Sequence, residues 1–258
     1  MRLRAIVAAL LIPGFCPLVA QLAAAPMPTA SEVIARMSAR DAQRDAASGG
    51  YTGNRQYFLE NSRFGKYARM AANEACAPDG TKILRVVSEE GWKSANSHVL
   101  REMLDSESET SRPLMRGKVQ ITADNYAFQM VGTDALGGRQ TYVIDVIPKR
   151  DEPFLIRGRI WVDAEEYALA RVEGQPAKNP SLWIRSVHFT QEYRKSGAYW
   201  FPSSTTSISE AHLFGKTEVT IHYFDYQPCA ETAVRHAGLP PKEASYVEYE
   251  IGPDSGRR

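Results

Sequence analysis

Three carboxylates stand close together in the sequence, and paired carboxylates are what general acid–base catalysis requires. Asp163, Glu165 and Glu166 lie in a short polar stretch between two expected strands, at residues 157–162 and 167–173. Adjacent carboxylates in a hairpin turn are usually solvated, whereas a catalytic acid needs burial to raise its pKa. We therefore interpret the three acids as a solvated turn.

Other residues capable of chemistry are scattered along the chain. The histidines have no cysteine or carboxylate at the spacing of a metal site; they are His98, His188, His212, His222 and His236. The chain has neither the Gly-x-Ser-x-Gly turn of a serine hydrolase nor a phosphate-binding loop. The sequence therefore predicts a protein that is not an enzyme and that uses neither a metal nor another cofactor.

Residues 1–25 have the three parts of a secretory signal peptide. Arg2 and Arg4 come first, an apolar run follows, and small residues at 23–25 offer a cleavage site. The apolar run is shorter and more interrupted than the roughly 20 residues that a membrane-spanning helix needs. We expect cleavage and export, which would give a soluble periplasmic protein with no transmembrane helix in the mature chain.

The charges of the chain are nearly balanced. There are 31 lysines and arginines against 30 aspartates and glutamates, which gives a formal net charge of +1. Nucleic-acid-binding domains usually carry a strongly basic surface. The composition therefore gives no electrostatic reason to expect nucleic acid as a partner.

Removal of residues 1–25 leaves Cys76 and Cys229 as the cysteines of the mature chain. In an oxidising compartment, two remaining cysteines are a reasonable disulfide pair, and the alternative is two unrelated thiols. A bridge would join the end of the second expected strand to the end of the last one.

A first helix is expected over residues 29–47. It begins with a capping box, in which Thr29 is followed three residues later by Glu32. Its apolar stripe is short, so the helix needs a partner surface to be stable. The stripe predicts a helix that docks on a sheet.

A second helix is expected over residues 94–106, where apolar side chains recur at helical spacing, and a polar loop follows at 106–111. This helix interrupts the strands, so it could act as a lid, with Leu100, Met103 and Leu104 turned inward. The alternative is an ordinary surface helix that covers the core.

Most of the remaining chain alternates between apolar and polar residues with the period of two that is typical of strands. We expect strands at residues 51–60, 63–72, 81–89, 118–122, 126–131, 139–148, 154–163, 167–173, 182–195, 199–209 and 216–227. The later strands follow one another without an intervening helix, which predicts an antiparallel meander. One domain, residues 29–230, would hold these elements, and residues 231–258 would form a flexible C-terminal tail.

The alternation also assigns side chains to faces of the sheet, and one face is large, apolar and rich in aromatic residues. The two helices bring few large apolar residues to cover it. The remaining apolar surface either packs against another part of the chain or encloses a cavity for an apolar guest. Trp161 has the opposite parity to its neighbours Ile160 and Val162, so its direction stays open. The residues that we expect to line the cavity are Tyr142, Ile144, Val146, Ile160, Trp161, Val162, Trp183, Val187, Phe189, Trp200, Val219, Ile221 and Tyr223.

Two stretches of the chain resemble a known family. Residues 158–174 read GRIWVDAEEYALARVEG, in which the first strand ends in Trp161, Val162 and Asp163 and the second carries Arg171 and Glu173. Residues 197–204 read GAYWFPSS, with the strand start Trp200, Phe201 and Pro202. Both are similar to stretches of the LolA/LolB-like superfamily of outer-membrane lipoprotein-sorting proteins, which also includes sensor domains of the MucB/RseB type.

The resemblance implies an α+β fold that is mainly β: a curved antiparallel sheet, or incomplete β-barrel, with helices covering its concave face. The space between them would hold lipid or lipoprotein acyl chains, in a non-catalytic periplasmic carrier or binding protein. A protein-interaction or stress-sensor module with an envelope protein as its partner is the alternative on the same fold. The resemblance also implies an arginine that holds the lid shut in the empty carrier, although the sequence does not identify that residue.

Overall fold

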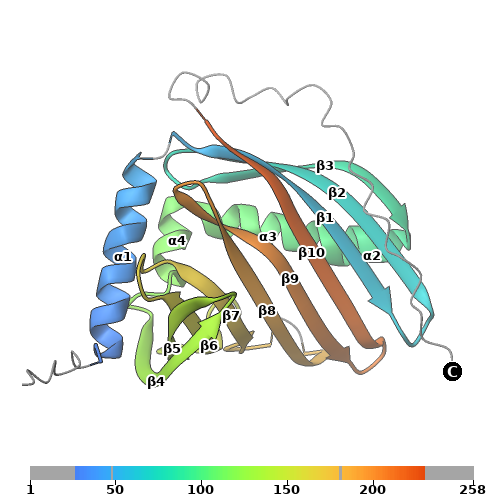
Figure 1. Ribbon diagram of the computed structural model, residues 1–258. Coiled ribbons are helices and arrows are strands. Elements are labelled where there is room, and N and C mark those ends of the chain that lie inside the picture. The colour runs from blue at the N-terminus through green and yellow to red at the C-terminus, as the bar shows by residue number, and fades with distance from the viewer. Residues whose placement is uncertain (1–26, 48, 180–181, 230–258) are drawn as a thin grey trace, which may run out of the picture.

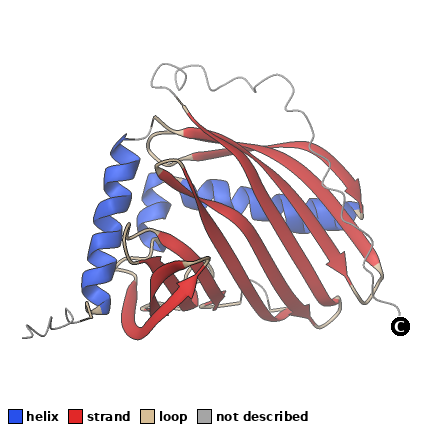
Figure 2. Ribbon diagram, viewed as in Figure 1, coloured by secondary structure: helices blue, strands red, loops and turns tan. Residues whose placement is uncertain are grey.

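The computed structural model describes residues 27–47, 49–179 and 182–229 of the chain. The predicted signal peptide, residues 1–25, and the predicted tail, residues 231–258, lie outside the described residues. The described part consists of one large sheet with helices packed against it, as Figure 1 and Figure 2 show.

Ten antiparallel strands form the sheet in the order β3-β2-β1-β10-β9-β8-β7-β6-β5-β4. β3 and β4 are its two edges, so the curved sheet is not closed into a barrel (Figure 1). The predicted fold class is confirmed. The strands are β1 Tyr51–Asn61, β2 Lys66–Cys76, β3 Lys82–Gly91, β4 Tyr126–Leu136, β5 Arg139–Pro148, β6 Ile156–Asp163, β7 Leu169–Pro176, β8 Ile184–Ser196, β9 Tyr199–Ala211 and β10 Gly215–Pro228.

The helical segments of the described chain are α1 Ala30–Ala47, α2 Lys93–Ala95, the π-turn η1 Asn96–Leu100, α3 Arg101–Ser111 and α4 Pro113–Val119. The predicted capping box begins α1, because the Thr29 N–H donates to the Glu32 carboxylate at 2.7 Å. α2, η1 and α3 follow one another without a break and form a long helix behind the sheet in Figure 1. We call this the cross helix.

Two predictions about the end of the cross helix are wrong. The polar residues 106–111 belong to α3, and no strand forms at 118–122, where residues 118 and 119 end α4 and residues 120–122 form bends. Polar residues are compatible with helix here because the Ser111 hydroxyl donates to the Ser108 carbonyl one turn earlier. Pro113 stands at the start of α4, where its missing N–H leaves no helical hydrogen bond unmade.

The helices pack on the same face of the sheet, which we call the inner face, and they bury its two ends. At one end, α1 packs Val33, Ile34 and Met37 against the inner-face side chains of β4, β5, β6 and β7. At the other end, the cross helix inserts Ala95, Leu100 and Leu104 over β1, β2 and β10. Each end buries its own apolar cluster, and burial of apolar area is the main stabilising contribution to such packing.

The pairing of β6 with β7 contains two glycines that face each other, Gly158 and Gly174. A Cβ atom built on Gly158 would lie 2.1 Å from the Glu173 carbonyl oxygen and 2.6 Å from the Gly174 Cα. The two backbones therefore approach more closely than any residue with a side chain would allow. This close approach lies in the hairpin that resembles the carrier superfamily.

Asp163 ends β6 and is fully buried, so the prediction of a solvated turn is wrong for this acid. Arg139 donates to both of its carboxylate oxygens, from Nε at 2.5 Å and from Nη2 at 2.9 Å. The backbone N–H of Glu166 donates to it as well, at 2.8 Å. Burial by itself raises the pKa of Asp163, but these donors outweigh burial and hold the pKa below its usual range. The prediction is right for Glu165, whose side chain is 81% exposed.

Replacing Asp163 with alanine is expected to lower the free energy of unfolding by about 3 kcal/mol, because the buried donors of the turn lose a charged acceptor. Urea unfolding at neutral pH measures the loss. Glu165→Ala is the matched control in the same turn, and we expect it to change stability by less than about 0.5 kcal/mol. Equal losses in the two variants would contradict the structural role of Asp163.

The predicted disulfide between Cys76 and Cys229 is wrong, since both side chains are free thiols. Cys76 ends β2 and Cys229 follows β10, and these strands lie on opposite sides of β1. Two strand spacings amount to roughly 10 Å, whereas the Cα atoms of a disulfide lie within about 7 Å of each other.

Candidate functional site

The apolar candidates from the sequence mostly lie on the inner face, where helices cover them. Ile144, Val146, Ile160 and Val162 are buried beneath α1. Val219, Ile221 and Tyr223 are buried beneath the cross helix. Tyr142 is half-buried at the margin of the first cluster, where its ring stacks on that of Tyr167. In this closed arrangement these side chains are core residues, and a ligand can reach them only if a helix moves.

Two tryptophans of the predicted cavity lie on the other face of the sheet. Trp161 packs with Val143 and Ala170 on the outer face, and Trp200 packs beside them. Their indole N–H groups donate to Asp134 at 3.1 Å and to Glu166 at 3.0 Å. The parity of Trp161 in β6 therefore decides its direction, and the indole points away from the helices.

The middle of the inner face is less completely covered than its ends. On β8, Val187 and Phe189 are half-buried, and Tyr193 beside them contacts the margin of the α1 cluster. On β9 the neighbouring residues with the same orientation are small and polar, among them Thr205 and Ser207. Trp183 stands apart from this group, just before β8, and is 63% exposed.

The three predicted lid residues all belong to the cross helix. Leu100 and Leu104 are buried against β1, β2 and β10, and Met103 packs on the margin of the same cluster. The helix therefore covers apolar residues of the inner face, which is what both the lid and the surface-helix alternatives require.

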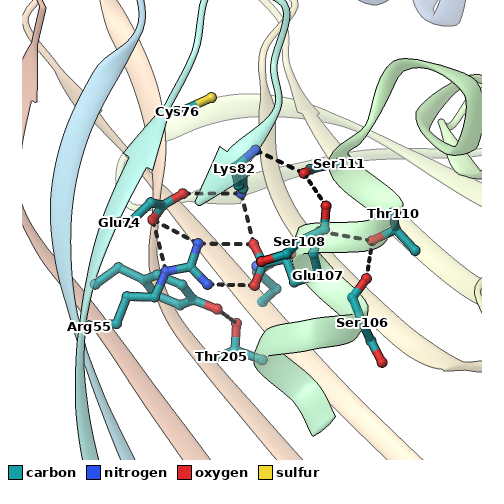
Figure 3. Close-up of polar contacts among 12 residues, drawn as sticks. Arg55, Glu74, Cys76, Lys82, Ser106, Glu107, Ser108, Thr110, Ser111 and Thr205 are labelled. Atoms are coloured by element: carbon teal, nitrogen blue, oxygen red, sulfur yellow. Dashed lines mark hydrogen bonds and ion pairs between the residues drawn. The ribbon is translucent and has the colours of Figure 1, made fainter. Parts of the chain in front are cut away.

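A buried group of charged residues connects the cross helix to the sheet (Figure 3). Arg55 comes from β1 and is 1% exposed. Its Nη1 and Nη2 donate to the two carboxylate oxygens of Glu107 on α3, at 2.5 and 2.9 Å. Its Nε donates to Glu74 of β2 at 2.8 Å. Lys82 of β3 donates to Glu107 at 2.8 Å and lies 3.4 Å from Glu74. We call these four residues the ionic clamp.

The charges of the clamp support one another. Burial tends to raise the pKa of Glu107, but the charges of Lys82 and Arg55 outweigh it and hold that pKa well below its usual range. Burial likewise opposes the charged forms of Arg55 and Lys82, yet Glu107 and Glu74 raise the pKa of both. Glu107, Arg55 and Lys82 are therefore charged at neutral pH, and both cations lie beside the Glu107 and Glu74 carboxyl groups.

Aromatic groups and hydroxyls surround the clamp on the sheet side. The Tyr223 ring lies under the Arg55 guanidinium, with the Cζ atom 4.9 Å from its centroid. The Tyr51 hydroxyl donates to Glu74 at 3.1 Å. The Ser111 hydroxyl, at the end of α3, accepts a hydrogen bond from the backbone N–H of Lys82 at 2.9 Å. The end of the cross helix is thus held through side chains of three strands, and apolar packing holds its beginning.

The sequence reasoning missed the clamp, although one signal was present. The alternation of β1 places Arg55 on the same face as the apolar residues Tyr57 and Leu59, and an arginine rarely occupies an inward position without a partner. Glu107 gave no such signal, because it stands in a run of polar residues that indicated a loop.

The described residues contain no group of three or more histidine, cysteine or acidic side chains that could hold a metal ion. Among the described helices, none has both the length and the apolar character needed to cross a bilayer.

Residues 120–227 match a family described as a family of unknown function, DUF5686. The match covers less than half of the chain and includes most of β4 to β10. A comparison with curated proteins finds no significant match.

Solved structures with a related fold share little sequence with the chain. A DUF1329 family protein from Desulfovibrio piger is 12% identical, with 83% of this chain and 100% of that chain covered and a TM-score of 0.44. A putative outer membrane lipoprotein-sorting protein domain from Vibrio parahaemolyticus is 13% identical, with 81% of this chain and 98% of that chain covered and a TM-score of 0.41. LolA superfamily protein NE2245 from Nitrosomonas europaea is 10% identical, with 83% of this chain and 100% of that chain covered and a TM-score of 0.36. The structural neighbours thus include the superfamily that the two sequence stretches resemble, and function has to be argued from the side chains of this chain.

Proposed function

We propose that the protein is a non-catalytic periplasmic carrier or binding protein for lipid or lipoprotein acyl chains. The observation that carries the proposal is the ionic clamp, which holds the cross helix over an apolar inner face. A helix that only covered core would be held sufficiently by Leu100 and Leu104. The clamp places four charges where this helix end meets the sheet, and Arg55 and Glu74 are fully buried there while Lys82 and Glu107 are partly buried. Such charges are costly to desolvate, and their retention favours a helix that has a closed and an open position.

A carrier requires that the binding free energy of its ligand be large enough to offset the cost of moving the helix. Burying one CH₂ group stabilises by about 0.8 kcal/mol, so a chain of sixteen carbons supplies about 12 kcal/mol. Moving the helix costs the contacts of Leu100 and Leu104, at about 2–3 kcal/mol each. It also costs the clamp, whose charges regain water when they separate. An acyl chain therefore has enough binding free energy to displace the helix, while a short apolar molecule has too little.

The proposed ligand site is the inner face between the two covered ends. Val187 and Phe189 of β8 are half-buried there, so an acyl chain could begin to bind before the helix has moved completely. Once the cross helix opens, Val219, Ile221 and Tyr223 would extend the apolar surface. Export to the periplasm belongs to the proposal and is supported by the layout of residues 1–25.

The test measures lipid binding directly and asks whether the clamp controls it. Native mass spectrometry of the purified protein should show co-purifying lipid, and a fluorescent fatty acid should bind after delipidation. Glu107→Gln should raise the affinity for the probe by about tenfold, because it weakens the closed position and enlarges the open fraction. Glu102→Gln is the matched control, since it removes the same charge from an exposed position of the same helix.

Absence of both bound lipid and probe binding would exclude the carrier. If an envelope protein instead co-purified stoichiometrically and survived delipidation, the alternative from the family resemblance, an interaction or stress-sensor module, would replace it. Equal probe affinities in the Glu107 and Glu102 variants would show that the clamp does not control access.

A further inference from the structure

Exposed aromatic and aliphatic side chains gather at the end of the sheet where β1, β3 and β9 finish and β8 begins. They lie on neighbouring loops and are Phe64, Leu182, Trp183, Leu213 and Phe214, and the half-buried Trp92 lies beside Phe64. We call this group the apolar rim. Leu182 is 98% exposed, Trp183 63% and Leu213 60%. The turns that join β1 to β2 and β9 to β10 lie at the lower end of the sheet in Figure 1.

The rim is continuous across the loops. The centroid of the Phe64 ring lies 5.9 Å from the centroid of the Trp92 ring and 6.1 Å from that of the Phe214 ring. The backbone N–H of His212, in the same turn as Phe214, donates to the Trp183 carbonyl at 3.1 Å. Rings from three separate segments thus contact one another, and the backbone hydrogen bond places the segment of Trp183 beside them. This is more than isolated exposed residues would explain.

Cations accompany the apolar side chains in each of these segments. The β1–β2 turn contains Arg63-Phe64-Gly65-Lys66, and the β9–β10 turn contains Leu213-Phe214-Gly215-Lys216. Lys93 follows Trp92, and Arg185 follows Trp183 by two positions. No aspartate or glutamate occurs within residues 61–66, 91–95, 182–187 or 211–217. The nearest acids, Glu60, Glu90, Glu210 and Glu218, directly adjoin three of these ranges, and the Glu218 carboxylate lies 4.0 Å from the Lys216 ammonium.

The two Phe-Gly-Lys turns present their side chains in the same way. Gly65 and Gly215 both adopt left-handed backbone conformations, with φ of 58° and 66°. Each turn therefore projects a phenylalanine at its tip, and an exposed lysine follows directly behind it. The Lys66 ammonium lies 5.4 Å from the centroid of the Trp92 ring, so cation and aromatic face the same region.

We propose that the apolar rim docks the protein on a lipid bilayer that contains anionic phospholipid. Tryptophan, phenylalanine and leucine at loop tips are suited to the boundary between headgroups and acyl chains. Lysine and arginine just behind them remain at the depth of the anionic headgroups. A protein interface instead concentrates its binding energy in buried pockets and is depleted of lysine. The cross helix begins at this rim, so docking would place the start of the helix at the membrane.

The test is co-sedimentation of the full chain with vesicles of phosphatidylcholine alone or mixed with phosphatidylglycerol. We expect tighter binding to the mixed vesicles, and weaker binding at high ionic strength. The double variant Lys66→Gln and Lys216→Gln should bind mixed vesicles about 30-fold more weakly, because each cation near an anionic surface contributes about fivefold. The double variant Trp183→Ser and Phe214→Ser should weaken binding to both vesicles on the order of tenfold, since it removes apolar area.

Leu114→Ser is the matched control. Leu114 is 86% exposed, but it lies on α4, whose Arg116 donates to the Asp79 carbonyl in the β2–β3 loop at the opposite end of the sheet. This variant should bind vesicles as the parent chain does. Unchanged far-ultraviolet circular dichroism and unfolding midpoints would show that the rim variants are folded.

Two results would overturn the proposal. One is a folded protein that binds neither type of vesicle, in which case the rim serves a protein partner. The other is vesicle binding that the rim variants leave unchanged. Binding through an acyl-chain site on the inner face would survive those substitutions, so failure of the rim is distinguishable from failure of the carrier function.

Discussion

Replacing Arg55 with leucine is expected to lower the free energy of unfolding by about 3–5 kcal/mol, since removal of one partner from a buried ion pair leaves the other uncompensated. Glu74 is fully buried and would lose its closest cation, which lies at 2.7 Å. Glu107 would lose both of its hydrogen bonds from the guanidinium. Lys82 remains close to both acids, so we expect the lower part of the range. Urea unfolding at neutral pH measures the change.

The matched control is Arg101→Leu, which breaks another ion pair between the cross helix and β3. Arg101 and Glu89 lie 2.7 Å apart, but the arginine side chain is 49% exposed. Water screens such a pair, so this variant should lose less than about 1 kcal/mol. Losses of the same size in the two variants would mean that the clamp contributes no more than a surface ion pair.

The pH dependence of stability provides a second measurement of the clamp. Because the pKa of Glu107 is depressed in the folded state, its contribution is complete above the unfolded pKa of about 4.3. That contribution is lost as the pH falls from there toward the folded pKa. The parent chain should therefore lose stability steeply below about pH 5, and Glu107→Gln, which cannot titrate, should lose it less steeply. Parallel curves for the two proteins would contradict this assignment.

Replacing Gly158 with alanine is expected to lower the free energy of unfolding by about 3 kcal/mol, at the upper end of the range for overpacking. The new methyl group would meet backbone atoms, the Glu173 carbonyl oxygen at 2.1 Å and the Gly174 Cα at 2.6 Å, and backbone cannot rotate away as a side chain can. β6 and β7 would have to separate, and Ile160 and Val172 in the α1 cluster would move with them. Denaturant unfolding followed by tryptophan fluorescence reports the loss.

Gly117→Ala is the control for the glycine substitution itself. Gly117 lies in α4, and a Cβ there would meet nothing within 4 Å. Alanine is the better helix former and restricts the unfolded chain, so this variant should gain up to about 1 kcal/mol. If Gly158→Ala also gained stability, the close approach of β6 and β7 would not need glycine.

The sequence by itself determined the antiparallel sheet, the helix at its start and the helix that interrupts its strands. These follow from local patterns. Side chains that alternate along a strand must reach opposite faces, which correctly grouped Ile144 with Val146 and Val219 with Ile221. The same rule places Trp161 on the face opposite to that of its neighbours Ile160 and Val162. Its indole does lie on that outer face, away from the predicted cavity.

The tertiary structure alone decided which charges meet. Arg55 and Glu107 are 52 residues apart, and nothing near Glu107 distinguishes it from the other acids of a polar run. The pairing of β2 with β1 on one side and with β3 on the other brings Glu74 and Lys82 close to Arg55, and the direction of the cross helix adds Glu107. The same strand order separates Cys76 from Cys229, because β1 lies between the strands that carry or precede them. Contacts of this kind depend on strand order and helix direction, and no local period of a sequence encodes either of them.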